Sequence, residues 1–431
     1  MNILYAGKIR ELSELNHGKV YQINASGNVD ISNVNLTLKN NPLEFKKMNG
    51  SFVLHDNDVY IKNFSGKISS SDFLLNGVFK NFISFLLIPD QSGEMQASLN
   101  SELIDLDEWL VNKTQVSSND TTYLMKFNPR LLSSLDVKIG KLNFRKFSAA
   151  NINGHVNLEK QVISGQDLQF NSMGGTVEMD ATINASRRDS ISMTYDVKFK
   201  KVDITRLFYE MENFDQQTMT DKNVKGVVSA DVQFISTWSK DLTLNSKSVR
   251  STSNIKIENG ELINFSPLKA LAKYIHAPDI NHIKFSTLQN NISIANRMIY
   301  IPHMDINSSA INISGNGTHD FDNNVDYHLR LLLSDVLGKK AKSNVTEFGE
   351  IEDDGLGHTK LFISMKGTVD NPNFSYDRKA AGDKVKNDIV LEKQNIKSLF
   401  KKEFGAVKNE PSVQTPKPKK REEMQIDWSS E

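Results

Sequence analysis

The chain has 431 residues, 52 basic and 52 acidic side chains, 38% hydrophobic residues and no cysteine. This length and composition allow a sizeable core. The zero net charge argues against nucleic acid as a partner, because neutralising phosphates requires clustered basic residues, and the missing cysteines exclude disulfides and thiolate sites.

One strand pattern occurs three times along the chain, at residues 43–82, 142–184 and 283–321. Each stretch is predicted to contain three strands in succession. Repeating units of about 40 residues that cannot bury an apolar face alone usually stack on their neighbours. The repeats therefore predict a long β array rather than a compact enzyme.

A clean alternation of apolar and polar residues supports this prediction. In residues 176–184, Val177, Met179, Ala181 and Ile183 fall on one face of a strand, and the residues between them are polar. The same alternation recurs in residues 192–199, 228–234 and 360–366. A period of two is typical of strands with one buried and one solvated face.

Short links rich in Asn, Asp and Gly separate the predicted strands. We interpret residues 49–50, 55–58, 153–154, 259–260 and 322–324 as such turns, because these residue types tolerate positive φ. Short turns favour antiparallel pairing. The predicted fold is therefore mainly β: an elongated, curved, largely antiparallel repeat sheet that forms a groove or open sandwich, with a few short amphipathic helices and a carboxy-terminal helix.

Four amphipathic segments predict helices, at residues 103–113, 203–214, 266–278 and 383–404. The first three are short, and we expect them to cover a sheet end or fill its mouth. The fourth is basic and suits an anionic membrane or a partner protein, or it packs on the last strands. The Pro-rich, charged segment that follows is predicted to be disordered.

These elements divide the chain into five predicted regions. Residues 1–112 and 113–214 are two β repeat regions that each end in a short helix, and 215–377 is the carboxy-terminal β region. Residues 378–408 hold the amphipathic basic helix, and 409–431 the disordered tail. No segment has the roughly 20 apolar residues of a membrane-spanning helix, and the first residues lack the pattern of a signal peptide.

Motifs for catalysis, cofactors and metals are missing from the sequence. His276, His282 and His303 lie near one another but not at metal-ligand spacing. The acidic residues 350–354 do not have the spacing of an EF-hand. We therefore expect no catalytic residue, no cofactor and no metal, although a triad assembled from distant residues stays open.

Residues 285–333, preceded by NIKIENGELINFSPLKALAKYI at 254–275 and followed by KLFISMKGTVDNPNFSYD at 360–377, resemble the carboxy-terminal region of AsmA-like proteins. The resemblance includes the strand with Gly315 and Gly317 and the Asp-Asn-Pro turn, and departs at Ala295–Arg297, where an Asn-Gly turn is expected. It implies an envelope protein of diderm bacteria with a β-rich body on the periplasmic face of the inner membrane. The amino-terminal membrane anchor usual in this family is not found in the sequence.

The resemblance also implies a role in outer-membrane assembly and phospholipid homeostasis or transport, with phospholipid or a membrane surface, and envelope proteins, as partners. The apolar residues would then line a groove for acyl chains, which gain about 0.8 kcal/mol per buried CH₂. The groove candidates are Val177, Met179, Ile183, Met193, Tyr195, Val197, Ile311, Ile313 and Leu361.

Two alternatives stay open. The same residues pack equally well under helices or a second sheet in a closed core. A periplasmic scaffold or adaptor that binds protein partners through strand edges and the carboxy-terminal helix would need no groove. A hydrolase on a β-solenoid would need repeating pairs of carboxylates, which the sequence lacks.

Overall fold

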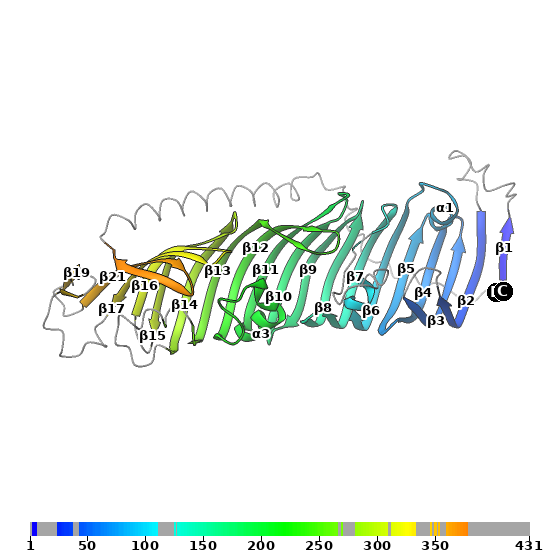
Figure 1. Cartoon of the computed structure of the whole chain (residues 1–431). Helices are drawn as coiled ribbons and strands as arrows, with labels where there is room; N and C mark the ends of the chain where they lie inside the picture. Colours follow the sequence, from blue (N-terminus) through cyan, green and yellow to red (C-terminus); the bar gives the residue numbers. More distant parts are fainter. Residues whose placement is uncertain are drawn as a thin grey trace, which may run out of the picture.

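The structure, a computed structural model, describes residues 2–6, 24–37, 43–110, 125, 127–265, 269, 281–308, 312–332, 345–346, 349–350, 352–353 and 359–377. Figure 1 shows strands lying side by side in chain order along an elongated array. The predicted helices at 266–278 and 383–404 and the disordered tail fall outside the described residues, apart from Lys269.

The strands are long and follow one another with few interruptions. Their bounds are β1 Asn2–Ala6, β2 Asn24–Thr37, β3 Glu44–His55, β4 Asp58–Ile68, β5 Ser71–Lys80, β6 Gly93–Asp105, β7 Leu131–Phe144, β8 Phe147–Glu159, β9 Val162–Ser172, β10 Gly175–Asn184, β11 Ser190–Asp203, β12 Val224–Ser239, β13 Leu244–Ile263, β14 His282–Ala295, β15 Met298–Ser308, β16 Asn312–Asp320, β17 Asn324–Leu332, β18 Val345–Thr346, β19 Gly349–Glu350, β20 Glu352–Asp353, β21 Thr359–Thr368 and β22 Asn371–Tyr376. The helices are α1 Phe82–Leu87, α2 Leu106–Leu110, α3 Ile204–Glu210 and the 3₁₀ turn η3 Glu212–Asp215.

One sheet contains nearly all of these strands. From β1 to β17 each strand pairs with the next, β17 then pairs with β21, and β21 pairs with β20 and β22. Every pair is antiparallel except β6 with β7, which is parallel; α2 follows β6 in the chain. Within the described residues β1 and β22 have one neighbour each, so the sheet is open. The prediction of a mainly β, largely antiparallel fold is confirmed.

The strand register places the apolar residues of successive strands on one face. A single row runs through Val29, Phe52, Ile61, Gly77, Ala97, Leu135, Val156, Gly165, Ala181, Tyr195, Phe234, Ser251, Ile294, Ile299, His319 and Val325. We call the side of the sheet that carries this row the inner face and the opposite side the outer face. Residues one position away along each strand point to the outer face.

Bulges bend many of the strands. Asn33, Lys47 and Asn63 have φ of 51°, 54° and 51° inside β2, β3 and β4, and the register shifts at each of them. The backbone N–H of Asn33 and of Asn63 donates to a side-chain oxygen of the next strand, at 2.9 and 2.7 Å. A bulge bends its strand and increases the twist. A row of bulges in neighbouring strands therefore curves the sheet.

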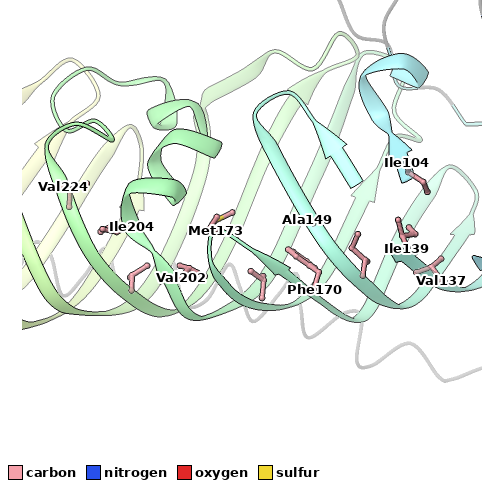
Figure 2. Packing of buried hydrophobic residues seen from close by; sticks show 12 residues of the cluster. Ile104, Val137, Ile139, Ala149, Phe170, Met173, Val202, Ile204 and Val224 are labelled. Carbon is pink, nitrogen blue, oxygen red and sulfur yellow. The ribbon is translucent and has the colours of Figure 1, made fainter. Parts of the chain in front are cut away.

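Buried side chains gather in separate clusters along the inner face. The largest cluster, from β6 to β13, includes Val137, Phe170 and Val177, and residues of α2 and α3 pack against it. Figure 2 shows Val137, Ile139 and Phe170 on the inner side of the curved strands. A second cluster joins β14 to β22. Fully burying one such side chain contributes about 1.5 to 3 kcal/mol.

Several local predictions are wrong. Residues 49–50, 153–154 and 259–260 lie inside β3, β8 and β13 rather than in turns, whereas 55–58 and 322–324 do contain turns. Asn259, with φ of 51°, occupies a bulge, because asparagine tolerates positive φ there as well as in a turn. The helix predicted at 103–113 begins only at Leu106, since Leu103 belongs to β6, and α1 was not predicted. The five predicted regions stay a prediction; the sheet hydrogen bonds continue across residues 214 and 215 through the pairing of β11 with β12.

Candidate functional site

The candidate site is the inner face, because the buried apolar clusters of the described residues lie along it. Four of the predicted groove residues meet directly on β10 and β11: Met179 pairs with Val197, and Ile183 pairs with Met193. Val177 lies on the same face of β10 and is 1% exposed. Met179 and Val197 pack against the β6–β13 cluster, and Ile183 packs beside Met193 in a smaller one.

Tyr195 is the polar exception among these predicted residues. Its ring lies beside Phe234 on β12, with centroids 6.1 Å apart. Its hydroxyl donates to the Met193 sulfur at 2.9 Å. Burial raises the pKa of the Tyr195 phenol to about 12, because an apolar surrounding disfavours the phenolate. The site is thus apolar enough to keep even this hydroxyl neutral at alkaline pH.

The remaining predicted residues lie far along the array. Ile313 in β16 is 5% exposed and belongs to the β14–β22 cluster. It pairs with Leu331, which pairs with Leu361 in β21. The side chain of Leu361 and all of Ile311 fall outside the described residues. The structure therefore brings the β10 and β11 residues together and places Ile313 on the same face in another cluster.

The amino-terminal end of the inner face was missed by the prediction. Phe52, Phe64 and Phe73 form an edge-to-face ladder across β3, β4 and β5, with centroids 5.2 and 5.0 Å apart. All three are only half-buried, and among the described residues none of β2 to β5 belongs to a buried cluster. The signal for it in the sequence is the set of phenylalanines in residues 43–82, which also forms part of the first repeat.

The outer face is polar and charged. Lysines and acidic residues pair across it, as in Lys198 with Asp231 at 3.7 Å and Lys256 with Glu258 at 2.7 Å. These side chains are about half exposed, and exposed ion pairs contribute about 0 to 1 kcal/mol. The pair on β13 holds the pKa of Glu258 below its usual value, chiefly through the hydrogen bond from Lys256. The outer face is therefore solvated rather than suited to binding a partner.

One set of residues on the outer face has the composition of a hydrolytic triad. Ser134 Oγ lies 3.0 Å from His155 Nε2, and His155 Nδ1 lies 3.0 Å from Asp136 Oδ1. However, His155 Nε2 also lies 3.0 Å from Asn157 Oδ1, a contact that needs a proton on the nitrogen that would act as the base. Asp136 is 84% exposed, whereas the orienting aspartate of such triads is buried. We assign no catalysis to these residues.

The histidines singled out from the sequence have ordinary partners where they are described. His282 Nε2 lies 2.8 Å from a Glu261 oxygen, and His303 Nε2 lies 2.6 Å from Asp305; His276 falls outside the described residues. In the described part of the chain no three His, Asp or Glu side chains group as metal ligands. None of the helices described there is long and apolar enough to cross a membrane.

Comparison with known proteins adds no relative. No protein-family model, no curated protein and no solved structure matches this chain.

Proposed function

We propose that the chain is a non-enzymatic cell-envelope protein that holds phospholipid acyl chains against its inner face and so contributes to outer-membrane assembly and phospholipid homeostasis or transport. The observation that supports it best is the row of mostly apolar residues that crosses the inner face of the sheet from β2 to β17. An apolar face of this length on curved strands suits acyl chains, which bind without directional contacts. The resemblance to AsmA-like proteins points the same way.

In this proposal the inner face is an open groove at one end and a core at the other. The half-buried ladder of Phe52, Phe64 and Phe73 leaves apolar surface for a ligand in β3 to β5. Towards β22, Ile363 and Met365 are 0% and 3% exposed, so protein side chains already fill that end. Acyl chains therefore enter and lie at the amino-terminal end.

The proposed location is the periplasmic face of the inner membrane. Lipid headgroups would project past the rim of the groove into water while the tails lie along the phenylalanine ladder. Each methylene that leaves water contributes about 0.8 kcal/mol. Burying a few methylenes therefore offsets the conformational entropy lost when one side chain becomes ordered.

A matched set of variants in β4 and its neighbours tests this proposal. Phe64 pairs with Leu75 on the inner face, and Val53 pairs with Tyr60 on the outer face. We expect F64E/L75E to reduce the phospholipid that co-purifies in mild detergent at least several-fold. Each bound acyl chain would remove the two new carboxylates from water, which costs free energy. Lipid extraction and mass spectrometry measure the content, with circular dichroism to confirm the fold.

The outer-face variant V53E/Y60E is the control and should keep its lipid, because Val53 and Tyr60 are already 44% and 51% exposed. Equal lipid content in both double variants, or none in the wild-type protein, would rule out the proposed groove.

A second candidate is a periplasmic scaffold or adaptor. Within the described residues β1 and β22 each pair with one strand only, so each leaves one edge unpaired, and this favours the second candidate. Unpaired strand edges bind extended segments of other proteins through backbone hydrogen bonds. This candidate needs no bound lipid, so a wild-type protein that lacks lipid but recovers envelope proteins would favour it.

A further inference from the structure

The short helix α1 has its polar and apolar sides reversed. It connects β5 to β6, and Figure 1 shows it at the rim of the array. Its one polar side chain, Ser84, is 0% exposed, whereas Leu86 is 65% exposed and Leu87 is exposed as well. A surface helix of a globular protein usually buries its apolar side chains and exposes its polar ones. The two leucines are therefore presented outwards at the rim.

Hydrogen bonds at both ends hold α1 in this orientation. Asn57 Nδ2 donates to Ser84 Oγ at 2.7 Å, and the Ser84 backbone N–H donates to Asn57 Oδ1 at 2.9 Å. At the other end, Arg130 Nη1 donates to the carbonyl oxygens of Phe85 and Ile88 at 3.2 and 3.3 Å. The Arg130 guanidinium also lies over the Phe85 ring, 5.0 Å from its centroid. Contacts with the sheet therefore fix which side of the helix faces outwards.

The apolar surface of the inner face continues into α1. Val59 on β4 pairs with Phe79 on β5, and both lie on the inner face. The Phe79 ring centroid lies 5.2 Å from that of Phe82 and 5.4 Å from that of Phe85 in α1. The strands β3 to β5 beside this point carry the half-buried phenylalanines of the proposed groove. The exposed leucines thus lie at the rim of the part of the inner face proposed to bind acyl chains.

We propose that α1 inserts Leu86 and Leu87 into the surface of a phospholipid bilayer and so holds the rim of the groove against the membrane from which lipid enters. The inference rests on the proposed function and names the element that docks. Residues 81–89 contain no ionisable side chain, so insertion removes no charge from water. Two leucines are too small a patch for a specific protein interface, which buries about 800 Å² per partner. A bilayer needs no matching surface.

A fluorescent probe on α1 tests the insertion in the full chain. The sequence has no cysteine, so L86C places an environment-sensitive nitrobenzoxadiazole probe at one position. We expect neutral phosphatidylcholine vesicles to shift its emission to the blue and raise it several-fold, and nitroxides on the acyl chains to quench it. Y60C, on the outer face at a side chain that is also exposed, is the control and should not respond. A probe on L86C that is already shifted without vesicles would show that protein covers α1 and would overturn the proposal.

Vesicle flotation measures the contribution of the two leucines. L86S/L87S should lower the partition coefficient at least about tenfold, and high salt should not weaken binding of the wild type, because no charge is involved. V53S/Y60S, which removes exposed apolar side chains from the outer face, should bind as the wild type does. Equal binding by the wild type and L86S/L87S, or binding that high salt abolishes, would overturn the insertion.

The lipid that co-purifies with the wild type is measured separately and distinguishes the two proposals. Co-purified phospholipid together with an L86C probe that does not respond to vesicles would overturn the role of α1 and leave the groove standing. A responding probe on a protein that carries no phospholipid would support the insertion and contradict the groove.

Discussion

The raised pKa values of two tyrosines, Tyr195 and Tyr327, show how apolar the inner face is. Tyr195 lies in β11 near the middle of the array, and Tyr327 lies in β17 over Gly317, where a Cβ would sit 2.3 Å from the tyrosine ring. Burial raises the pKa of each phenol to about 12, from a usual value of 10.0. Glycine at position 317 therefore makes room for the ring that closes this part of the face.

These pKa values predict a loss of stability at alkaline pH. The folded protein keeps two protons that the unfolded chain releases above pH 10.0, so the free energy of unfolding should fall between pH 10 and 12 and be unaffected by these groups below pH 10. The loss is about 2 to 3 kcal/mol per tyrosine at most. Urea unfolding of Y195F/Y327F from pH 8 to 12 should show a shallower decline than the wild type. Y60F is the control, and equal declines in all three proteins would contradict the assignment.

At the scale of the element, the bulges explain both the curvature and the errors of the sequence interpretation. Alternation identified the strands, because the register requires apolar residues at every second position on one face. It did not identify bulges, since an Asn-Gly pair suits a turn and a bulge equally well, as residues 49–50 and 259–260 show. The site was predicted in part. β10 and β11 alternate regularly, so their apolar residues could be assigned to one face. In β4 the bulge at Asn63 interrupts the alternation, so the sequence did not show that Phe52 and Phe64 share a face.

Asn63 allows a direct test of a bulge. Its φ is 51° and its side chain is exposed, so the backbone alone decides which residues fit. N63V should destabilise the region around β4 by about 1 to 2 kcal/mol, because a left-handed conformation is strained for a β-branched residue. N63G should leave this region as stable or more so, because glycine adopts positive φ without strain. Hydrogen exchange of the β3 to β5 amides measures the difference, and equal protection in both variants would show that the bulge does not form.

At the scale of the whole molecule, length is the distinctive property of this fold. Each strand contacts its neighbours in the sheet, so stability is expected to accumulate locally, as in repeat proteins. The buried clusters occupy the middle and the carboxy-terminal end, and the half-buried phenylalanines lie towards the other end. This difference along one face separates the structural part of the array from the part proposed to bind lipid. Composition could not predict it, because apolar residues occur in all the repeats.

Site-specific photo-crosslinking tests directly whether the inner face binds lipid. A benzophenone amino acid replaces Phe64 on the inner face of β4 or Tyr60 on its outer face, and the protein is irradiated in cells with labelled phospholipid. We expect a phospholipid adduct at position 64 and little or none at position 60. Adducts of equal yield at the two positions, or adducts to protein alone at position 64, would contradict a lipid-binding inner face.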